Sequence, residues 1–445
     1  MKKIRIRSLS PVALISLGFF IIIFIGTILL LMPFSSVTHN TSFLDAFFTS
    51  TSATCVTGLT TVNTSTHWSI IGQIIILVLI QIGGLGFMTI ITLFSLLIKK
   101  NLSLYNQTVL MQSAGSYSIS DVGKIVKRVF IGTFTFEGIG ALILSICLWP
   151  KYGTKSIFYG IFHSVSSFCN AGFDIFGNSL TDYSNNWIVM STISILIIVG
   201  GLGFIVWSDV IDCKFRFKNL QLHSKIVLLS TLFLIFVPAL LFFIFEFTNI
   251  GQSQSFEGYS LSSSILNSIF LSISPRTAGF NSVNIANLSG SAKLLTIILM
   301  FIGGNSGSTA GGLKVTTFIV VFRNLISSAK GEQDVVLFKR KIPTSIIKQS
   351  TSLLIAYLTC SVIATLIICS LEGLSLESVL FEVVSAIGTV GLSLGLTPTL
   401  GVISKLILIF LMYIGRIGAL TLFSLFFKRH NDLILKNPEG KILVG

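Results

Sequence analysis

Charged side chains are scarce in this chain of 445 residues, of which Asp, Glu, Lys and Arg make up only 10%. Soluble domains carry about 25% charged residues. Hydrophobic residues make up 52% of the chain, and the mean hydropathy is +0.90. The shortage of charge excludes a soluble globular domain. The apolar runs are long and do not alternate, which indicates membrane helices and not an outer-membrane barrel.

Patterns typical of metal sites, disulfide frameworks and catalytic centres are also missing. The six cysteines have no paired spacing. The histidines are scattered along the chain, at His39, His67, His163, His223 and His430. Because the titratable residues form no nucleophile–base or metal cluster, we do not expect an enzyme. Cys55 and Cys169 are interpreted as small buried loop residues, with a bridge between them as the alternative.

Acidic residues are few as well, 16 against 30 Lys and Arg, which gives a net charge of +14. Such an excess can indicate nucleic-acid binding, but its distribution argues against that. Most basic residues lie at the two ends and in alternate segments between the apolar runs, at 1–7, 99–128, 214–225, 323–348 and 428–445. The positive-inside rule places these segments in the cytoplasm. We therefore expect both termini inside, an even number of crossings and no nucleic-acid partner.

One pattern recurs four times, at intervals of about 110 residues. A long apolar helix, predicted at 226–247 in the third repeat, comes first in each unit. A short amphipathic stretch, 43–52 in the first repeat, then leads to a loop that contains a glycine, and a second long helix follows, predicted at 70–98 in the first repeat and 187–207 in the second. The recurring glycines are Gly58, Gly172, Gly279 and Gly391. Regular spacing of this kind indicates an internal repeat. The four repeats are predicted at 1–115, 116–222, 223–342 and 343–445.

The predicted fold is an all-α polytopic membrane protein with eight transmembrane helices and four re-entrant pore helices around one central pore. Each short stretch spans only about 15 Å as a helix, so it enters the membrane and turns back. Backbone at that depth needs protein or a water-filled cavity around it. The four repeats share one orientation, which favours a pore. The alternative is an ion-coupled secondary transporter with a midplane site, since such transporters are often built from inverted repeats.

The recurring glycines have a physical use, because glycine adopts positive φ and can turn successive carbonyl groups the same way. Carbonyl oxygens from four such loops can replace the water shell of a monovalent cation. An ordinary glycine turn is the alternative for any single loop. Four loops in register favour a cation site. Its residues would be Cys55, Val56, Thr57, Gly58, Cys169, Asn170, Ala171, Gly172, Arg276, Thr277, Ala278, Gly279, Gly388, Thr389, Val390 and Gly391.

The second long apolar run of the third repeat, predicted at 294–322, is interrupted by a glycine-rich stretch. Glycine disfavours helix, and Ser, Thr and Asn compete with it through local hydrogen bonds. We therefore predict a broken helix with an irregular segment that faces the pore. A phosphate loop is the alternative, but no strand precedes it. The candidate gate residues are Gly303, Gly304, Asn305, Ser306, Gly307, Ser308, Thr309, Ala310, Gly311, Gly312 and Lys314.

Arg416 lies 11 residues after Lys405 and 12 before Lys428, the charges that flank its predicted helix, 403–427, which places it about 17–18 Å from either charge. That depth is too great for its side chain to reach water through lipid. A charge there must face a wet cavity or pair with a carboxylate, for which Glu137 and Glu382 are candidates. The repeat alignment places Arg416 beside the glycine-rich segment and favours the cavity. We therefore include Arg416 in the gate.

These loops resemble those of the Trk/Ktr/HKT superfamily of K⁺ transporters, and most of all those of its bacterial KtrB membrane subunits. The resemblance covers essentially the whole chain, and its motifs are Thr57-Gly58, Asn170-Ala171-Gly172-Phe173, Arg276-Thr277-Ala278-Gly279-Phe280-Asn281 and Gly388-Thr389-Val390-Gly391. It implies K⁺ uptake across the bacterial plasma membrane. It also implies that 303–312 is an intramembrane gating loop.

The same resemblance implies a homodimer and a KtrA-like cytosolic ring of nucleotide-binding RCK domains. The nucleotide would act only through that partner, and no covalently bound cofactor is expected. K⁺ is the transported ion, and Na⁺ is allowed as a second cation. The third position before each glycine is Cys, Cys, Arg and Gly in the four loops. Selectivity should therefore rest on backbone carbonyls and not on these side chains.

Overall fold

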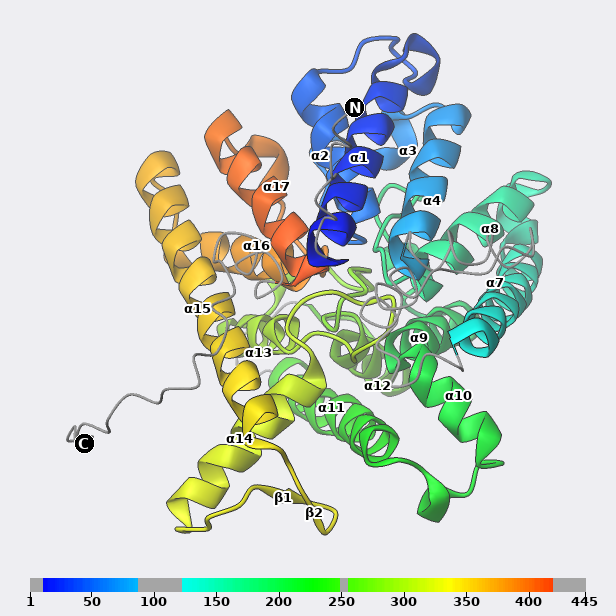
Figure 1. The fold of residues 1–445 in the computed structure, drawn as a ribbon. Helices are drawn as coiled ribbons and strands as arrows, with labels where there is room; N and C mark the ends of the chain where they lie inside the picture. The colour runs from blue at the N-terminus through cyan, green and yellow to red at the C-terminus, as the bar shows by residue number, and fades with distance from the viewer. Residues whose placement is uncertain (1–10, 87–121, 249–254, 419–445) are drawn as a thin grey trace, which may run out of the picture.

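A computed structural model describes residues 11–86, 122–248 and 255–418, in which the regular elements are helices apart from one short hairpin (Figure 1). The predicted cytoplasmic segments 1–7 and 428–445 lie outside the described residues, as do 99–121 and the ends of the helices predicted at 70–98 and 403–427. Within these ranges, four long helices are apolar enough to cross a membrane: α1 (Pro11–Leu31), α7 (Val122–Tyr152), α11 (Leu222–Phe247) and α15 (Thr344–Glu372). A third or less of each apolar window is buried, as suits helices that face lipid.

Each long helix is followed by a shorter one: α2 (Phe43–Thr54), α8 (Lys155–Phe168), α12 (Leu261–Ile273) and α16 (Leu376–Gly388). Serine caps begin three of them, because Ser42, Ser260 and Ser375 accept a backbone N–H of the first turn with their side chains. The C-terminal ends of all four helices are buried. The short helices therefore point their final turns into the middle of the protein.

A third helix closes each group: α4 (Ile70–Leu85), α9 (Trp187–Leu202), α13 (Gly290–Phe301) and α17 (Val402–Ile417). The continuous helix predicted at 187–207 is wrong. The chain bends by 89° after α9 and continues as α10 (Phe204–Asp212). The cause is Gly203, which has φ 99° and directs the N–H of Phe204 to the carbonyl of Gly307 at 2.8 Å. α4 and α17 also end at glycines with positive φ, Gly86 and Gly418.

The third group has an irregular segment, 302–314, between α13 and α14 (Val315–Ala329), where the sequence predicted one. A small hairpin, β1 (Val336–Leu337) and β2 (Arg340–Lys341), follows α14. The sequence did not predict this hairpin. Single turns complete the described chain at η1 (Pro33–Ser35), α3 (Thr64–His67), η2 (Thr181–Tyr183), η3 (Phe217–Asn219), η4 (Ile285–Asn287) and η5 (Thr397–Thr399).

The groups follow one another around a common centre, which Figure 1 shows as a progression of colour around the picture. Within each group the first helix packs on the short helix. Between groups, the third helix of one contacts the short helix of the next: α4 on α8, α9 on α12, α13 on α16 and α17 on α2. This closed order brings the ends of the four short helices together.

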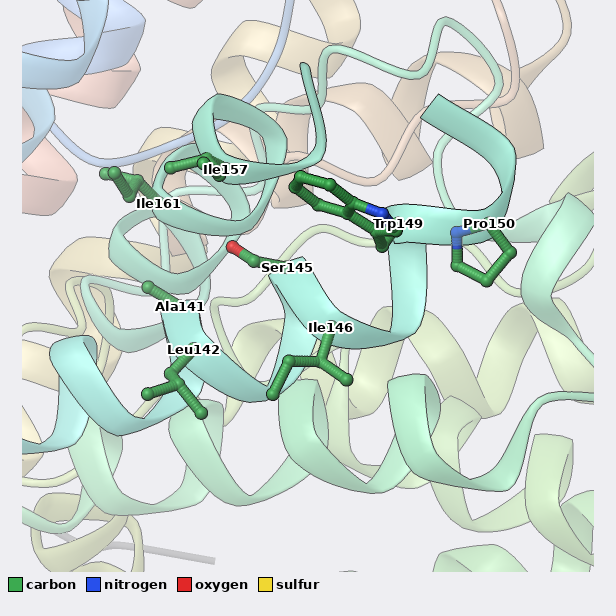
Figure 2. Close-up of a pocket in the computed structure, with 8 residues that line it drawn as sticks. All are labelled: Ala141, Leu142, Ser145, Ile146, Trp149, Pro150, Ile157 and Ile161. Atoms are coloured by element: carbon green, nitrogen blue, oxygen red, sulfur yellow. The ribbon is translucent and has the colours of Figure 1, made fainter. Parts of the chain in front are cut away.

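An apolar hollow lies away from this centre, between α7 and α8 (Figure 2). Its volume is about 560 Å³, and Ser145 is the polar residue among Ala141, Leu142, Ser145, Ile146, Trp149, Pro150, Ile157 and Ile161. None of the predicted site residues lines it. It offers no charged group to an ion, so the candidate site is sought at the centre.

Candidate functional site

The loops that follow the four short helices meet in a closed ring. We call them the glycine loops: 55–58, 169–172, 276–279 and 388–391. A Cβ atom placed on Gly58 would lie 2.5 Å from the carbonyl oxygen of Ala171, and one on Gly172 would lie 2.8 Å from that of Ala278. On Gly279 it would collide with the carbonyl of Val390, and on Gly391 with that of Thr57. Each loop therefore presses against the next, and the fourth returns to the first.

The backbone of each glycine loop alternates in handedness. Gly58, Gly172, Gly279 and Gly391 have φ of 93°, 70°, 75° and 94°. The residue two before each glycine also has positive φ: Val56, Asn170, Thr277 and Thr389. The predicted positive φ of the glycines is confirmed. Positive φ at alternate residues can aim successive carbonyls to one side, although L-residues other than glycine adopt it at a cost.

Serine hydroxyls hold the loops against the ends of their helices. Ser52 Oγ accepts the N–H of Gly58 at 3.0 Å, and Ser385 Oγ accepts that of Gly391 at 3.1 Å. In the second and third loops the hydroxyl donates instead. Ser166 Oγ donates to the carbonyl of Phe173 at 2.7 Å, and Ser274 Oγ donates to the carbonyl of Phe280 at 2.5 Å. Every loop is thus fixed by a side chain from its own short helix. These serines were not among the predicted site residues.

Burial of the predicted site residues is nearly complete. Of the residues in the four glycine loops, only Gly391 is partly exposed, and the rest are buried. Arg276 is 7% exposed, although it carries a guanidinium group. No group of three or more His, Cys, Asp or Glu within the described ranges could hold a metal ion. What the ring offers a cation is therefore backbone oxygen, which suits a monovalent ion stripped of water.

The glycines of the third helices bring those helices close to the ring. A Cβ atom on Gly83, Gly200 or Gly415 would collide with a carbonyl at the end of a short helix. The carbonyls belong to Thr54, Phe168 and Ile387, each four residues before its loop glycine. These glycines therefore let the third helices pack closely against the ends of the short helices.

The glycine-rich segment, 303–312, crosses from the third group to the second. The N–H of Asn305 donates to the carbonyl of Gly201 at 3.3 Å, and its side-chain amide does so at 3.0 Å. Thr309 donates from its hydroxyl to the carbonyl of Phe168 at 3.2 Å and from its N–H to that of Gly200 at 3.4 Å. These bonds join the segment to the end of α9 and of α8.

The same segment also reaches the fourth group. The N–H of Gly312 donates to the carbonyl of Gly415 at 3.0 Å. A Cβ atom on Gly311 would collide with the side chain of Thr389, and one on Gly312 would lie 2.7 Å from the carbonyl of Gly388. The segment therefore packs directly against the fourth glycine loop, and its glycines are what permit that approach.

Arg416 links this segment to the first group. Its guanidinium donates to the carbonyl of Thr309 and to the carbonyls of Gly83 and Gly84, the last at 3.1 Å. No ion pair in the described ranges includes Arg416. The alternative of a buried pair with Glu137 or Glu382 therefore does not hold. A cation at the C-terminal end of α4 is stabilised by the helix carbonyls.

The two buried carboxylates have other partners. Glu382 accepts from the hydroxyls of Ser393 at 2.5 Å and Thr397 at 2.6 Å, and from the N–H of Leu394 at 3.2 Å. It therefore fixes the chain that follows the fourth glycine loop. Glu137 accepts from the side chain of Gln81 at 3.2 Å. Gln81 was not singled out from the sequence, although a polar side chain within an apolar helix was the available signal.

Lys314 bonds within its own segment, because its ammonium donates to the carbonyls of Ala310 at 2.6 Å and Gly311 at 3.2 Å. It precedes α14 as the N-cap residue, and the strand on which a phosphate loop depends does not precede it in the described structure. The phosphate-loop alternative therefore has no support here. Lys314 instead donates hydrogen bonds to carbonyl oxygens of the glycine-rich segment.

A polar cavity of about 750 Å³ lies among the chain segments that follow the second, third and fourth glycine loops. Its lining includes the carboxylates of Asp174 and Glu257 and the amide of Asn281, but no Lys or Arg. Burial raises the pKa of the Asp174 carboxyl. The hydrogen bonds that it accepts from the N–H groups of Gly177 and Ser179 oppose that rise. A cavity of this charge attracts cations and repels anions.

Comparisons with known proteins identify the family of the chain. The model of a family described as TrkH, cation transport protein, matches residues 3–434. The potassium/sodium uptake protein NtpJ of Enterococcus hirae is 42% identical over 454 residues, covering 100% of this chain and 99% of the relative. The Ktr system potassium uptake protein B of Bacillus subtilis is 38% identical over 445 residues, again covering 100% and 99%.

A solved structure has the same fold. The potassium transporter TrkH from Vibrio parahaemolyticus superposes with a TM-score of 0.74 at 18% identity, covering 96% of this chain and 87% of that one. The family implied by the sequence motifs is thus confirmed, and with it an all-α, multi-pass membrane protein. Since the family model spans nearly the whole chain and two full-length relatives exceed 30% identity, the chain belongs to the TrkH family of cation transport proteins, which are transporters and not enzymes.

Proposed function

We propose that this protein is the K⁺-translocating subunit of a bacterial uptake system, with the ring of four glycine loops as its selectivity filter. The observation that carries the proposal is the closed ring, in which each loop glycine lies against a carbonyl of the next loop. Oxygens gathered in this way can replace the hydration shell of K⁺. The names of the relatives support it, since one is a potassium/sodium uptake protein and another a Ktr system potassium uptake protein.

The proposed pore is built from four repeats, at 1–115, 116–222, 223–342 and 343–445. Each would contribute two transmembrane helices and one re-entrant helix, which gives eight spanning helices around one central axis with both termini in the cytoplasm. The closed order of contacts between groups supports this arrangement. The third helices of the described chain are short or bent, so the lower half of the pore is not a simple helical bundle.

The proposed gate is the glycine-rich segment with Lys314 and Arg416. The segment bonds to the second and fourth groups directly and to the first through Arg416. It therefore crosses the space below the ring in the conformation described here. Two cationic side chains next to it raise the barrier for a passing cation. Opening requires that the bonds from Asn305, Thr309 and Arg416 break.

The proposed assembly is a homodimer that binds a KtrA-like ring of cytosolic RCK domains in the plasma membrane. The name of the Bacillus relative, a Ktr system protein, supports a system of more than one part. Nucleotide would act through that ring. Na⁺ is a second proposed cation, because the Enterococcus relative is named for both potassium and sodium.

Cation flux into vesicles tests the proposal. Purified protein is reconstituted, and uptake of K⁺, Rb⁺, Na⁺ and Li⁺ is measured at a fixed membrane potential. We expect K⁺ and Rb⁺ to pass at least about ten-fold faster than Li⁺, because backbone carbonyls replace the weakly held water shell of K⁺ and Rb⁺ more readily than the strongly held shell of Li⁺. Equal rates for all four ions would overturn the filter. Uptake that requires a fixed ratio of a second ion would instead favour the ion-coupled secondary transporter.

A further inference from the structure

A basic and aromatic turn joins α10 to α11. We call it the 214–218 turn, and its residues alternate in kind: Lys214, Phe215, Arg216, Phe217 and Lys218. All of them are exposed, and Phe215 is 82% exposed. Figure 1 shows the turn beyond the end of α10, at the edge of the molecule. Two neighbouring aromatic side chains outside the core indicate a contact with something other than this fold.

The two flanking helices hold the turn. Lys214 and Phe215 have φ of 49° and 61°, a left-handed conformation that residues with a side chain adopt at a cost. The N–H of Phe215 donates to the carbonyl of Val210 in α10 at 3.0 Å. The ammonium of Lys225 in α11 donates to the carbonyl of Lys218 at 2.8 Å. The position of the turn therefore follows that of α10 and α11.

The length of α11 places the turn at the level of the lipid headgroups. α11 begins four residues after Lys218, and its 26 residues form a helix of about 39 Å. The hydrocarbon core of a bilayer is about 30 Å thick, so a helix of this length reaches the headgroup region. Its first turn carries Lys225, and a charged group is costly within hydrocarbon. The 214–218 turn thus lies beside lipid phosphates, and Phe215 is near enough to meet acyl chains.

The described chain does not balance the charge of this turn. None of the ion pairs in the described ranges includes Lys214, Arg216 or Lys218. The carboxylate nearest in sequence, Asp212, pairs with Arg128 at 2.8 Å. Basic side chains next to exposed aromatic ones suit a surface that presents negative charge above apolar chains. An anionic membrane leaflet has this chemistry.

We propose that the 214–218 turn is a binding site for anionic phospholipids. Lys214, Arg216 and Lys218 bind the phosphate groups, and Phe215 inserts between the acyl chains below them. The bound lipid anchors one end of α10 at the membrane surface. The other end of α10 is bonded to the glycine-rich segment through its first N–H group. The site is separate from the ring, and the inference holds whichever ion the ring selects.

Photo-crosslinking from the turn tests this inference. Phe215→p-benzoylphenylalanine places the photoreactive group in the turn, and Leu240→p-benzoylphenylalanine places it within α11, where Leu240 is 60% exposed. Both variants are reconstituted in vesicles of equal parts phosphatidylglycerol and phosphatidylcholine, and lipid adducts are identified by mass spectrometry. Position 240 should label the two lipids equally. Position 215 should label phosphatidylglycerol at least about five-fold more, since each nearby basic residue attracts anionic lipid.

The variant K214Q/R216Q/K218Q, combined with the probe at position 215, removes the three charges of the turn. Its preference for phosphatidylglycerol should fall to that of position 240. If this variant does not insert into vesicles, the comparison of positions 215 and 240 decides alone. Labelling of position 240 without any lipid adduct at position 215 overturns the inference, and so does an equal preference at the two positions.

The matched control is K339Q/R340Q/K341Q, which removes as many exposed basic side chains from the hairpin region. It should keep the preference at position 215. An equal loss in both triple variants, or a preference that survives in K214Q/R216Q/K218Q, overturns the inference. An RCK-type protein encoded beside this chain is also added to the vesicles. If position 215 then labels that protein in place of lipid, the turn docks a protein and the inference is wrong.

Discussion

At the scale of single residues, the ring depends on glycines whose missing side chains leave room for neighbouring carbonyls. Replacing Gly58 or Gly279 by Ser adds a Cβ atom against Ala171 or Val390 and forces a side chain into positive φ. We expect the K⁺/Na⁺ flux ratio to fall about ten-fold, because the carbonyls are re-aimed while hydropathy hardly changes. Membrane insertion should be unaffected. Ion-selective flux and the amount of membrane-inserted protein are the two measurements.

Gly138 offers the matched control for both glycine substitutions. It lies in α7, and a Cβ atom there would meet nothing within 4 Å. Gly138→Ser should therefore keep the original flux ratio. If the ratio is also unchanged in G58S and G279S, the ring does not select the ion.

Arg416 yields a second prediction at this scale. Arg416→Ala removes donors to Thr309, Gly83 and Gly84, and it removes a positive charge beside the ion path. We expect K⁺ flux per folded molecule to rise several-fold, because the segment is released from the first group and the barrier falls. Flux normalised to folded protein, measured by size-exclusion chromatography, is the test.

Arg416→Lys is the control for charge. Lysine keeps the charge but loses the forked geometry that lets one side chain reach three carbonyls. Its flux should lie between that of the unaltered protein and that of R416A. Loss of folded protein in R416A, with no gain in flux per folded molecule, would show that the arginine serves stability alone.

The sequence predicted features of single residues correctly where they depend only on the position of a residue within its own helix. The depth of Arg416 showed that it needed a partner. Its partners are backbone carbonyls at the end of another helix, and no sequence pattern marks them. The contacts of Gln81 with Glu137 and Cys169 were missed for a related reason, since the three residues lie on three separate elements. Such contacts follow from the packing of helices and not from any local motif.

At the scale of elements, hydropathy and turn residues predicted the helices with small errors. The short helix expected at 43–52 is Phe43–Thr54, and the long one expected at 226–247 is Leu222–Phe247. The bend after α9 was missed. Its glycine cluster, 200–203, looks like one that merely permits close packing. The helix ends because Gly307, on a different element, accepts the N–H of Phe204.

The glycine-rich segment gives the prediction at this scale. Deleting 306–309 removes the bonds that reach Gly200, Phe204 and Arg416 but leaves Gly311 and Gly312 beside the fourth loop. We expect basal K⁺ flux to rise several-fold and to depend less on a cytosolic partner, since fewer bonds must break for opening. Flux with and without the partner measures both effects.

A variant in which 306–309 are replaced by four glycines is the control for length. It keeps the span of the segment but loses the side-chain bonds of Ser306, Ser308 and Thr309. Its flux should be intermediate. A deletion that only lowers flux or folded yield would mean that the segment serves packing and does not gate.

At the scale of the whole molecule, the period of about 110 residues predicted a ring, because equivalent units around one axis present equivalent loops to the centre. The exceptions to symmetry lie where the proposed gate and the charges are. The third group has the irregular segment 302–314 between its helix halves, whereas the second bends at Gly203, and the fourth has an arginine where the first two have Gly84 and Gly201. Symmetry would therefore account for the proposed filter, and its local loss for the proposed gate.

The last prediction concerns the link between the gate and a cytosolic partner. α14 begins directly after Lys314 and leads to the hairpin (Figure 1). Lys339, Arg340 and Lys341 of this hairpin region are exposed. A partner that pulls on this helix would move the glycine-rich segment with it. We expect an RCK-type protein encoded beside this chain to co-elute with it, and the triple variant K339E/R340E/K341E to weaken that complex at least about ten-fold, since three charges are reversed.

The comparison variant is R216E/K218E, which reverses exposed charges in the turn between α10 and α11. If basic charge serves only to orient the chain in the membrane, both variants should bind the partner equally. Weaker binding confined to the hairpin variant would place the docking surface at α14, where a movement of the helix reaches the segment through Lys314. Failure of the unaltered chain to co-elute with any such protein would contradict the proposed assembly.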